Sequence, residues 1–182
     1  IESVILCLNC PYNSLKTEAL LATQRLFAQI SPKDLQSAGF SSDSLKSLLE
    51  ALEKLWIESV VHVPRTEKNI SKRKTMETLW AEVDEKKRSI LSDDLDIFIL
   101  QRITTCRQIV SVLRTLAVVR GAEICQILCE ASFIKNTLLP FCLMECDDWE
   151  IYKDSLILAE ALSTFLVVDE GILQWSVEQC RA

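Results

Sequence analysis

The chain has 182 residues, of which 49% are hydrophobic, and it contains only 3 Gly and 4 Pro. So much apolar material with so few turn residues excludes a largely disordered chain and favours long helices joined by short loops. The formal net charge of −6 argues against a nucleic-acid-binding role for the chain as a whole. No uninterrupted apolar run reaches the roughly 18 residues that span a bilayer, so we expect no membrane segment.

The first 64 residues are predicted to form degenerate helical repeats. Apolar residues recur there at helical spacing, and Ser, Asn and Asp stand where helix N-termini are expected. Pro32 fits the first turn of a helix, where its missing N–H costs nothing. The pattern predicts helices over 3–8, from Asn13 or Ser14 to Ile30 and over 32–37, and a long helix that is capped by Ser41, Ser42 or Asp43 and ends before Pro64.

Residues 65–89 read as a charged connector, partly helical. Met76, Leu79, Trp80 and Val83 stand at helical spacing, which predicts a loop to about residue 71 and then a surface helix; a mobile linker is the alternative. Residues 65–88 hold 8 Lys or Arg against 5 acidic residues, a basic patch that could contact phosphates or act as a targeting signal. Acidic residues lie between these basic ones, which favours an ordinary solvent-exposed surface over either role. The patch consists of Lys72, Arg73, Lys74, Lys86, Lys87 and Arg88.

Residues 90–182 carry the clearest helical pattern. Ser92-Asp93-Asp94 is predicted to open either one long helix to Val119 or two helices joined near 102–105, and Gly121 ends this stretch. Asp147 or Asp148 is expected to cap a later long helix. The remaining elements are short helices over about 122–130 and 133–145, the capped helix to Val168, and a last helix over about 170–181.

A motif in this part of the chain nearly recurs 49 residues later. Val112-Leu-Arg-Thr-Leu-Ala-Val-Val119 is echoed by Ala161-Leu-Ser-Thr-Phe-Leu-Val-Val168, and both copies have helical spacing. A recurrence at this interval is typical of helical-repeat arrays, in which each unit buries its apolar face against its neighbours.

The order of elements from Arg107 onward resembles the armadillo and HEAT family of helical repeats. Glu130-Ala131-Ser132-Phe133 stands where armadillo units carry an Ala-Gly-aromatic step, and the two echoing segments stand at the third helix of a unit. Ala38-Gly39-Phe40 repeats the step in weaker form, close to two repeats earlier. The resemblance implies an all-α fold: a right-handed α-solenoid of about eight to ten helices in one continuous domain.

Ile1 lies inside an apolar stretch, so we expect a fragment of a larger protein, with a trimmed small protein as the alternative.

One departure from the armadillo pattern bears on function. The family's peptide-binding members use Asn in the third helix to grip the backbone of an extended peptide, whereas this chain has Thr115 and Thr164 at the matching positions. A hydroxyl cannot make the two-sided contact of an amide. Recognition of basic nuclear-import peptides is therefore not expected.

Few residues offer a basis for catalysis. His62 is the only His and lies at a predicted helix end, which removes most His-based acid–base schemes. The eight cysteines lie mostly in apolar runs, where a free thiol behaves as a small buried hydrophobe, and no four zinc ligands converge. Acidic clusters at 93–96, 147–150 and 169–170 fall at predicted helix starts, where capping explains them. We expect no enzyme activity, no cofactor, no metal and no small-molecule substrate.

The pattern therefore favours a protein-interaction scaffold, because stacked helices present an extended surface to another protein chain or peptide. A nucleic-acid-associated module built on residues 65–88 is the alternative. A second surface is the acidic C-terminal third, where residues 121–182 hold 11 acidic residues against 3 basic ones and could take a Lys/Arg-rich peptide. Unpaired cysteines and basic clusters indicate an intracellular protein, in the nucleus or cytoplasm with the nucleus favoured.

The partner-binding groove is expected between two polar stripes, one on the helix over 107–119 and one on the helix that follows Asp148. The same stripes would be the solvated side of two helices if no partner binds there. The predicted groove residues are Arg107, Ser111, Arg114, Thr115, Lys153, Glu160, Ser163 and Thr164.

Overall fold

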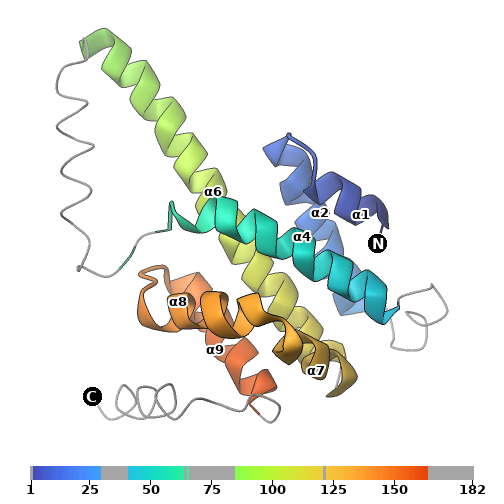
Figure 1. Cartoon of the computed structure of the whole chain (residues 1–182). Helices are drawn as coiled ribbons and strands as arrows, with labels where there is room; N and C mark the ends of the chain where they lie inside the picture. Colours follow the sequence, from blue (N-terminus) through green and yellow to red (C-terminus); the bar gives the residue numbers. More distant parts are fainter. Residues whose placement is uncertain (1, 30–40, 64, 66–84, 121, 164–182) are drawn as a thin grey trace.

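The structure is a computed structural model, and it describes residues 2–29, 41–63, 65, 85–120 and 122–163 (Figure 1). Over residues 85–94 it describes the backbone alone. The described part of the chain is all-α, and its one pairing outside the helices is an isolated antiparallel bridge between Arg65 and Cys146. The helices are α1 (Glu2–Leu8), α2 (Asn13–Gln29), α4 (Ser42–Val60), α6 (Glu85–Arg120), α7 (Ala122–Glu130), the π-helix η2 (Ile134–Leu138), α8 (Leu139–Met144) and α9 (Trp149–Leu162).

Local signals in the sequence account for several of these bounds. The Ser41 side chain caps α4 by accepting a hydrogen bond from the backbone N–H of Ser44 at 3.1 Å. Asp148 caps α9 in the same way, with its carboxylate accepting from the N–H groups of Glu150 and Ile151. Helix α7 spans the range that the sequence predicts. The helices predicted over 32–37, within 72–83 and over 170–181 lie outside the described residues.

Two expectations about helix bounds are wrong. Helix α6 begins at Glu85, so Ser92-Asp93-Asp94 lies inside it and does not open it. Capping residues are tolerated in the middle of a helix when good helix formers such as Lys and Glu precede them, as they do here. The segment 133–145 is divided into η2 and α8, because Pro140 lacks the N–H that a regular α-helix would use and a wider turn precedes it.

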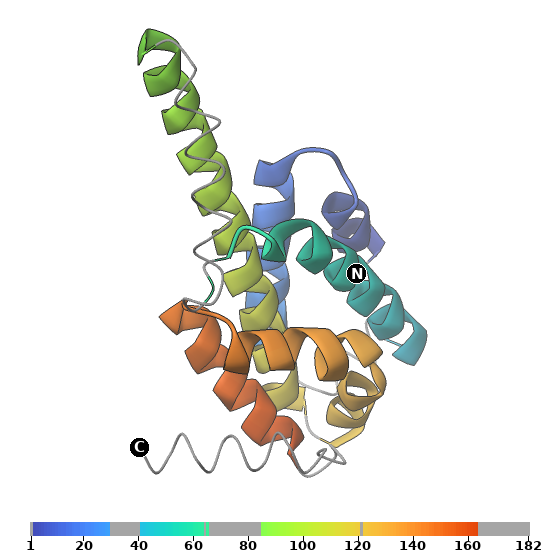
Figure 2. The same cartoon turned by 60° about the vertical axis from the view of Figure 1, so that its left-hand side comes forward.

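Apart from α7 and η2, the described helices form two layers, which Figures 1 and 2 show from two sides. The second layer consists of α2, α6 and α9, with α6 in the middle and in contact with both neighbours. The first layer consists of α1, α4 and α8: α1 contacts α4, and the rings of Trp56 and Phe141 bring α4 and α8 together at 5.9 Å. Each helix of the first layer packs on its partner in the second, α1 on α2, α4 on α6 and α8 on α9.

The three helices of the second layer run in the same direction. Lys16 and Arg102 both approach the carboxylate of Glu58, and further along both helices Gln24 donates to Ser111 at 2.7 Å, so α2 and α6 are parallel. Contacts between α6 and α9 also advance together along the two chains. Arg107 pairs with Asp148, and Arg114 pairs with Asp154. Helices α2, α6 and α9 therefore lie side by side with the same polarity.

The hydrophobic core lies between the two layers. Trp56 and Leu52 of α4 and Ile109, Leu113 and Leu116 of α6 are fully buried. Apolar residues at helical spacing on each helix produce these buried stripes, as the sequence pattern predicts. Ile97 and Leu100, nearer the N-terminal end of α6, are more than half exposed, and Figure 1 shows that end projecting away from the other described helices.

Replacing Leu113 by Ala should lower the free energy of unfolding by about 2–5 kcal/mol, because truncating a fully buried Leu leaves a cavity. The matched control is Leu100→Ala on the same helix, where the side chain is 58% exposed and the change should cost about 0.5 kcal/mol or less. Urea denaturation followed by circular dichroism measures both values. Equal losses in the two variants would contradict the core described above.

Candidate functional site

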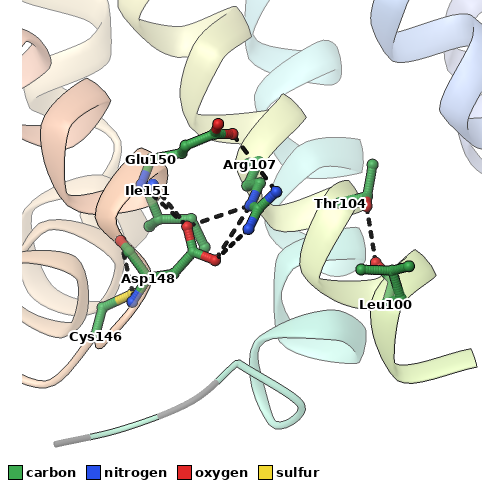
Figure 3. A network of polar contacts seen from close by, with 7 residues as sticks. All are labelled: Leu100, Thr104, Arg107, Cys146, Asp148, Glu150 and Ile151. Atoms are coloured by element: carbon green, nitrogen blue, oxygen red, sulfur yellow. Dashed lines mark hydrogen bonds and ion pairs between the residues drawn. The ribbon is translucent and has the colours of Figure 1, made fainter. Parts of the chain in front are cut away.

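The most extensive polar network in the described structure joins α6 to the start of α9 (Figure 3). The guanidinium of Arg107 donates to both carboxylate oxygens of Asp148, with Nη2 at 2.8 Å from Oδ2 and Nε at 3.1 Å from the same atom. Its Nη1 lies 3.5 Å from a carboxylate oxygen of Glu150. Asp148 is 9% exposed and also caps α9, so one carboxylate starts that helix and holds it against α6.

Protonation equilibria reflect this arrangement. Burial by itself would raise the pKa of the Asp148 carboxyl, but hydrogen bonds from Arg107 and from the N–H groups of Ile151 and Glu150 outweigh it and hold the pKa below its ordinary value. Hydrogen bonding to Asp148 in turn raises the pKa of Arg107. Both groups are therefore charged at neutral pH, and the pair acts as a structural joint between two helices.

The four α6 residues predicted to line a groove are engaged within the molecule. Arg107 pairs with Asp148 as described, and Arg114 lies 3.3 Å from Asp154, so both arginines face α9. Ser111 accepts a hydrogen bond from Gln24 of α2. Thr115 is 8% exposed, and its hydroxyl donates to the Ser111 carbonyl at 2.8 Å. These side chains hold α6 to its neighbours, and of the four only Arg107 keeps more than a third of its side chain exposed.

The predicted residues of α9 that the structure describes lie on the solvent-exposed side of that helix. Lys153, Glu160 and Ser163 are exposed, and the Ser163 hydroxyl donates to the Glu160 carbonyl at 2.7 Å. Thr164 lies outside the described residues. Helices α6 and α9 pack directly on each other, and the predicted residues of α9 are more exposed than those of α6. A binding groove between the two sets stays a prediction.

Large apolar side chains accompany those α9 residues, and the sequence analysis did not single them out. Trp149 is 68% exposed and Leu156 is 41% exposed, on the stripe of α9 opposite the buried Leu158. The Trp149 ring lies 5.9 Å from that of Tyr152. We call Trp149, Lys153, Leu156 and Glu160 the α9 stripe. The sequence offered one sign of this surface: Leu156 follows Trp149 by seven positions, with Lys153 between them. The same spacing also suits the buried face of a helix.

The basic patch is described only in part. Lys72, Arg73 and Lys74 lie outside the described residues, and Lys86, Lys87 and Arg88 belong to the first turns of α6. A nucleic-acid-associated role for residues 65–88 therefore stays a prediction.

The surroundings of His62 and of several cysteines shift the pKa values of these groups. Burial, and then the nearby charge of Arg102, lowers the pKa of His62, whose ring packs edge-on against Phe98 at 5.2 Å. Burial raises the pKa of Cys146 to about 11 and also raises the pKa of Cys106 and of Cys142, so these thiols are protonated at neutral pH. Within the part of the chain that the structure describes, no three His, Cys, Asp or Glu residues are grouped so as to hold a metal ion.

Among the described helices, none alone is long and apolar enough to cross a bilayer. Helix α7 and the segment η2–α8 meet the length and composition of a span only when taken together, and this pair is bent by 71°.

In comparisons with known proteins, the chain matches no protein-family model, no curated protein and no solved structure.

The stability contributed by Asp148 should be present above about pH 5 and decline as the pH falls below about 4. The reason is that its pKa is lowered by folding, so the unfolded chain takes up the proton first. Asp148→Asn keeps a capping side chain but cannot ionise. Its urea midpoint should lie below that of the wild type at about pH 7 and approach it at about pH 3. A gap between the two midpoints that stays constant over this range would contradict a charge-dependent joint.

Proposed function

We propose that the chain is a non-catalytic helical-repeat scaffold domain that binds another protein chain or peptide. The arrangement that supports this is the pair of helical layers with parallel neighbours, α2, α6 and α9 in one and α1, α4 and α8 in the other. An armadillo/HEAT-like α-solenoid is built in this way, with equivalent helices of successive units side by side.

The assignment of units follows from chain order. Helices α7, η2–α8 and α9 correspond to the first, second and third helices of one unit, and α4 and α6 to the second and third helices of the unit before it. The motif Val112–Val119 lies in α6, and the first residues of its echo, Ala161 and Leu162, end α9. The two copies thus begin on neighbouring helices, although the ion pairs that join α6 to α9 link residues 41 and 40 positions apart and not 49.

The α9 stripe is the surface that we assign to the partner. An aromatic side chain that is 68% exposed is costly to leave in water, and Trp is enriched among the residues that dominate binding energy at protein interfaces. Lys153 lies between the two apolar residues and Glu160 follows them with the opposite charge, an arrangement that favours one orientation of a bound chain. The single observation that carries the proposal is this exposed stripe at the edge of the second layer.

An intracellular protein, nuclear or cytoplasmic, within a larger assembly remains our proposal for its setting. The cysteines that the structure describes are free thiols, which fits a reducing compartment.

A variant with Trp149→Ala and Lys153→Glu should bind its protein partner at least about thirtyfold more weakly than the wild type, because truncating a central aromatic costs about 2 kcal/mol or more. The partner is first captured from cell extract with the wild-type chain, identified by mass spectrometry, and then titrated as a purified protein. Tyr12→Ala is the matched control, since this aromatic is 69% exposed and lies at the other edge of the molecule between α1 and α2. Equal affinity for the wild type and the α9 variant, with unchanged circular dichroism, would overturn the assignment.

A further inference from the structure

A cleft of about 320 Å³ lies between α4 on one side and, on the other, the end of α7 with the segment 131–133 that follows it. Part of its lining is apolar: Leu49 is 5% exposed, Phe133 is 4% exposed, and Ile127 is half-buried beside them. Ala131-Ser132-Phe133, the step on which the armadillo resemblance partly rests, forms one wall. The cleft lies away from the α9 stripe and is built from different elements.

Three of the residues that line this cleft carry carboxylates. Glu50 and Glu53 project from α4, and Glu130 stands at the end of α7 on the opposite side. Among the described residues that line the cleft, Lys46 is the one cation. Neither Glu50 nor Glu53 has an ion pair or hydrogen bond with a described residue, and Glu130 accepts only a hydrogen bond of 3.4 Å from Gln126.

This combination selects a type of ligand. Like charges gathered around a cleft with low-dielectric walls focus a negative potential, which raises the local concentration of cations. An apolar floor adds a preference for an aliphatic or aromatic side chain. A small metal ion would need several oxygen ligands at contact distance, and in the described structure these residues form no such group.

We propose that this cleft binds a Lys- or Arg-bearing segment of a partner protein, with an apolar side chain seated on Leu49 and Phe133 and the cationic groups facing Glu50, Glu53 and Glu130. The inference rests on the proposed protein-binding function and specifies one partner chemistry for it. Two of the three carboxylates come from α4, so the site differs from the acidic C-terminal third expected from the sequence.

The test is a fluorescence-anisotropy titration with a short labelled peptide in which Lys and Leu alternate. A second peptide with Gln in place of each Lys reports the contribution of charge. Glu50→Lys combined with Glu53→Lys should weaken binding of the Lys peptide by about tenfold, since two attractive contacts become repulsive ones. The matched control, Glu18→Lys with Asp96→Lys, changes the net charge equally at exposed carboxylates outside the cleft and should bind as the wild type does.

Two further results complete the test. Binding should weaken as salt is added, and backbone amide signals of residues 46–53 and 127–133 should shift in the NMR spectrum when peptide is added. Equal affinity for the Lys and Gln peptides, or unchanged affinity in the Glu50/Glu53 variant, would overturn the proposal.

The experiment separates this inference from the proposed function. The α9 variant with Trp149→Ala and Lys153→Glu should keep full affinity for the Lys peptide, because the cleft does not include those residues. A peptide that is lost by the α9 variant and retained by the Glu50/Glu53 variant would overturn the cleft assignment and leave protein binding by the α9 stripe in place.

Discussion

The burial of one stripe of α6 is the constraint on which the rest of the described structure depends. Ile109, Leu113 and Leu116 are completely buried beneath α4 and between α2 and α9, and each such side chain contributes about 1.5–3 kcal/mol relative to exposure. Apolar burial is non-directional, so it does not by itself fix how far each neighbour slides along α6. The polar pairs at the two edges supply that information: Gln24 with Ser111 on one side, and Arg107 with Asp148 on the other.

Much of the helical framework could be predicted from the sequence, because helix periodicity and caps are local signals. The bounds of α7 and the caps Ser41 and Asp148 were among the predicted alternatives. The start of α6 was predicted wrongly, since Ser92-Asp93-Asp94 has the composition of a cap while the residues before it can propagate a helix. A local rule takes such a segment for the start of a helix, even where helix-forming residues stand on both sides of it.

The candidate site was harder to predict, because exposure depends on partners far away in the sequence. Arg107 and Arg114 stand on a polar stripe, which suits either a binding surface or a pair of interhelical ion bridges. Their carboxylate partners lie about forty positions later on α9, and no local pattern reveals that pairing. The same limitation hid Trp149 and Leu156, the apolar members of the α9 stripe, and the acidic cleft, because both depend on which faces the packing leaves uncovered. If both surfaces operate, a mutation in one should leave the other intact, because they share no residue.

The parallel packing of α6 and α9 is the central claim, and paramagnetic relaxation enhancement tests it most directly. A nitroxide attached through a non-canonical amino acid at position 150, an exposed site near the start of α9, avoids the native thiols. Parallel helices place this label beside Arg107, so amide signals around residues 104–110 of α6 should broaden while those around Val118 stay sharp. Broadening around Val118 with sharp signals near Arg107 would show an antiparallel pair and contradict the repeat arrangement.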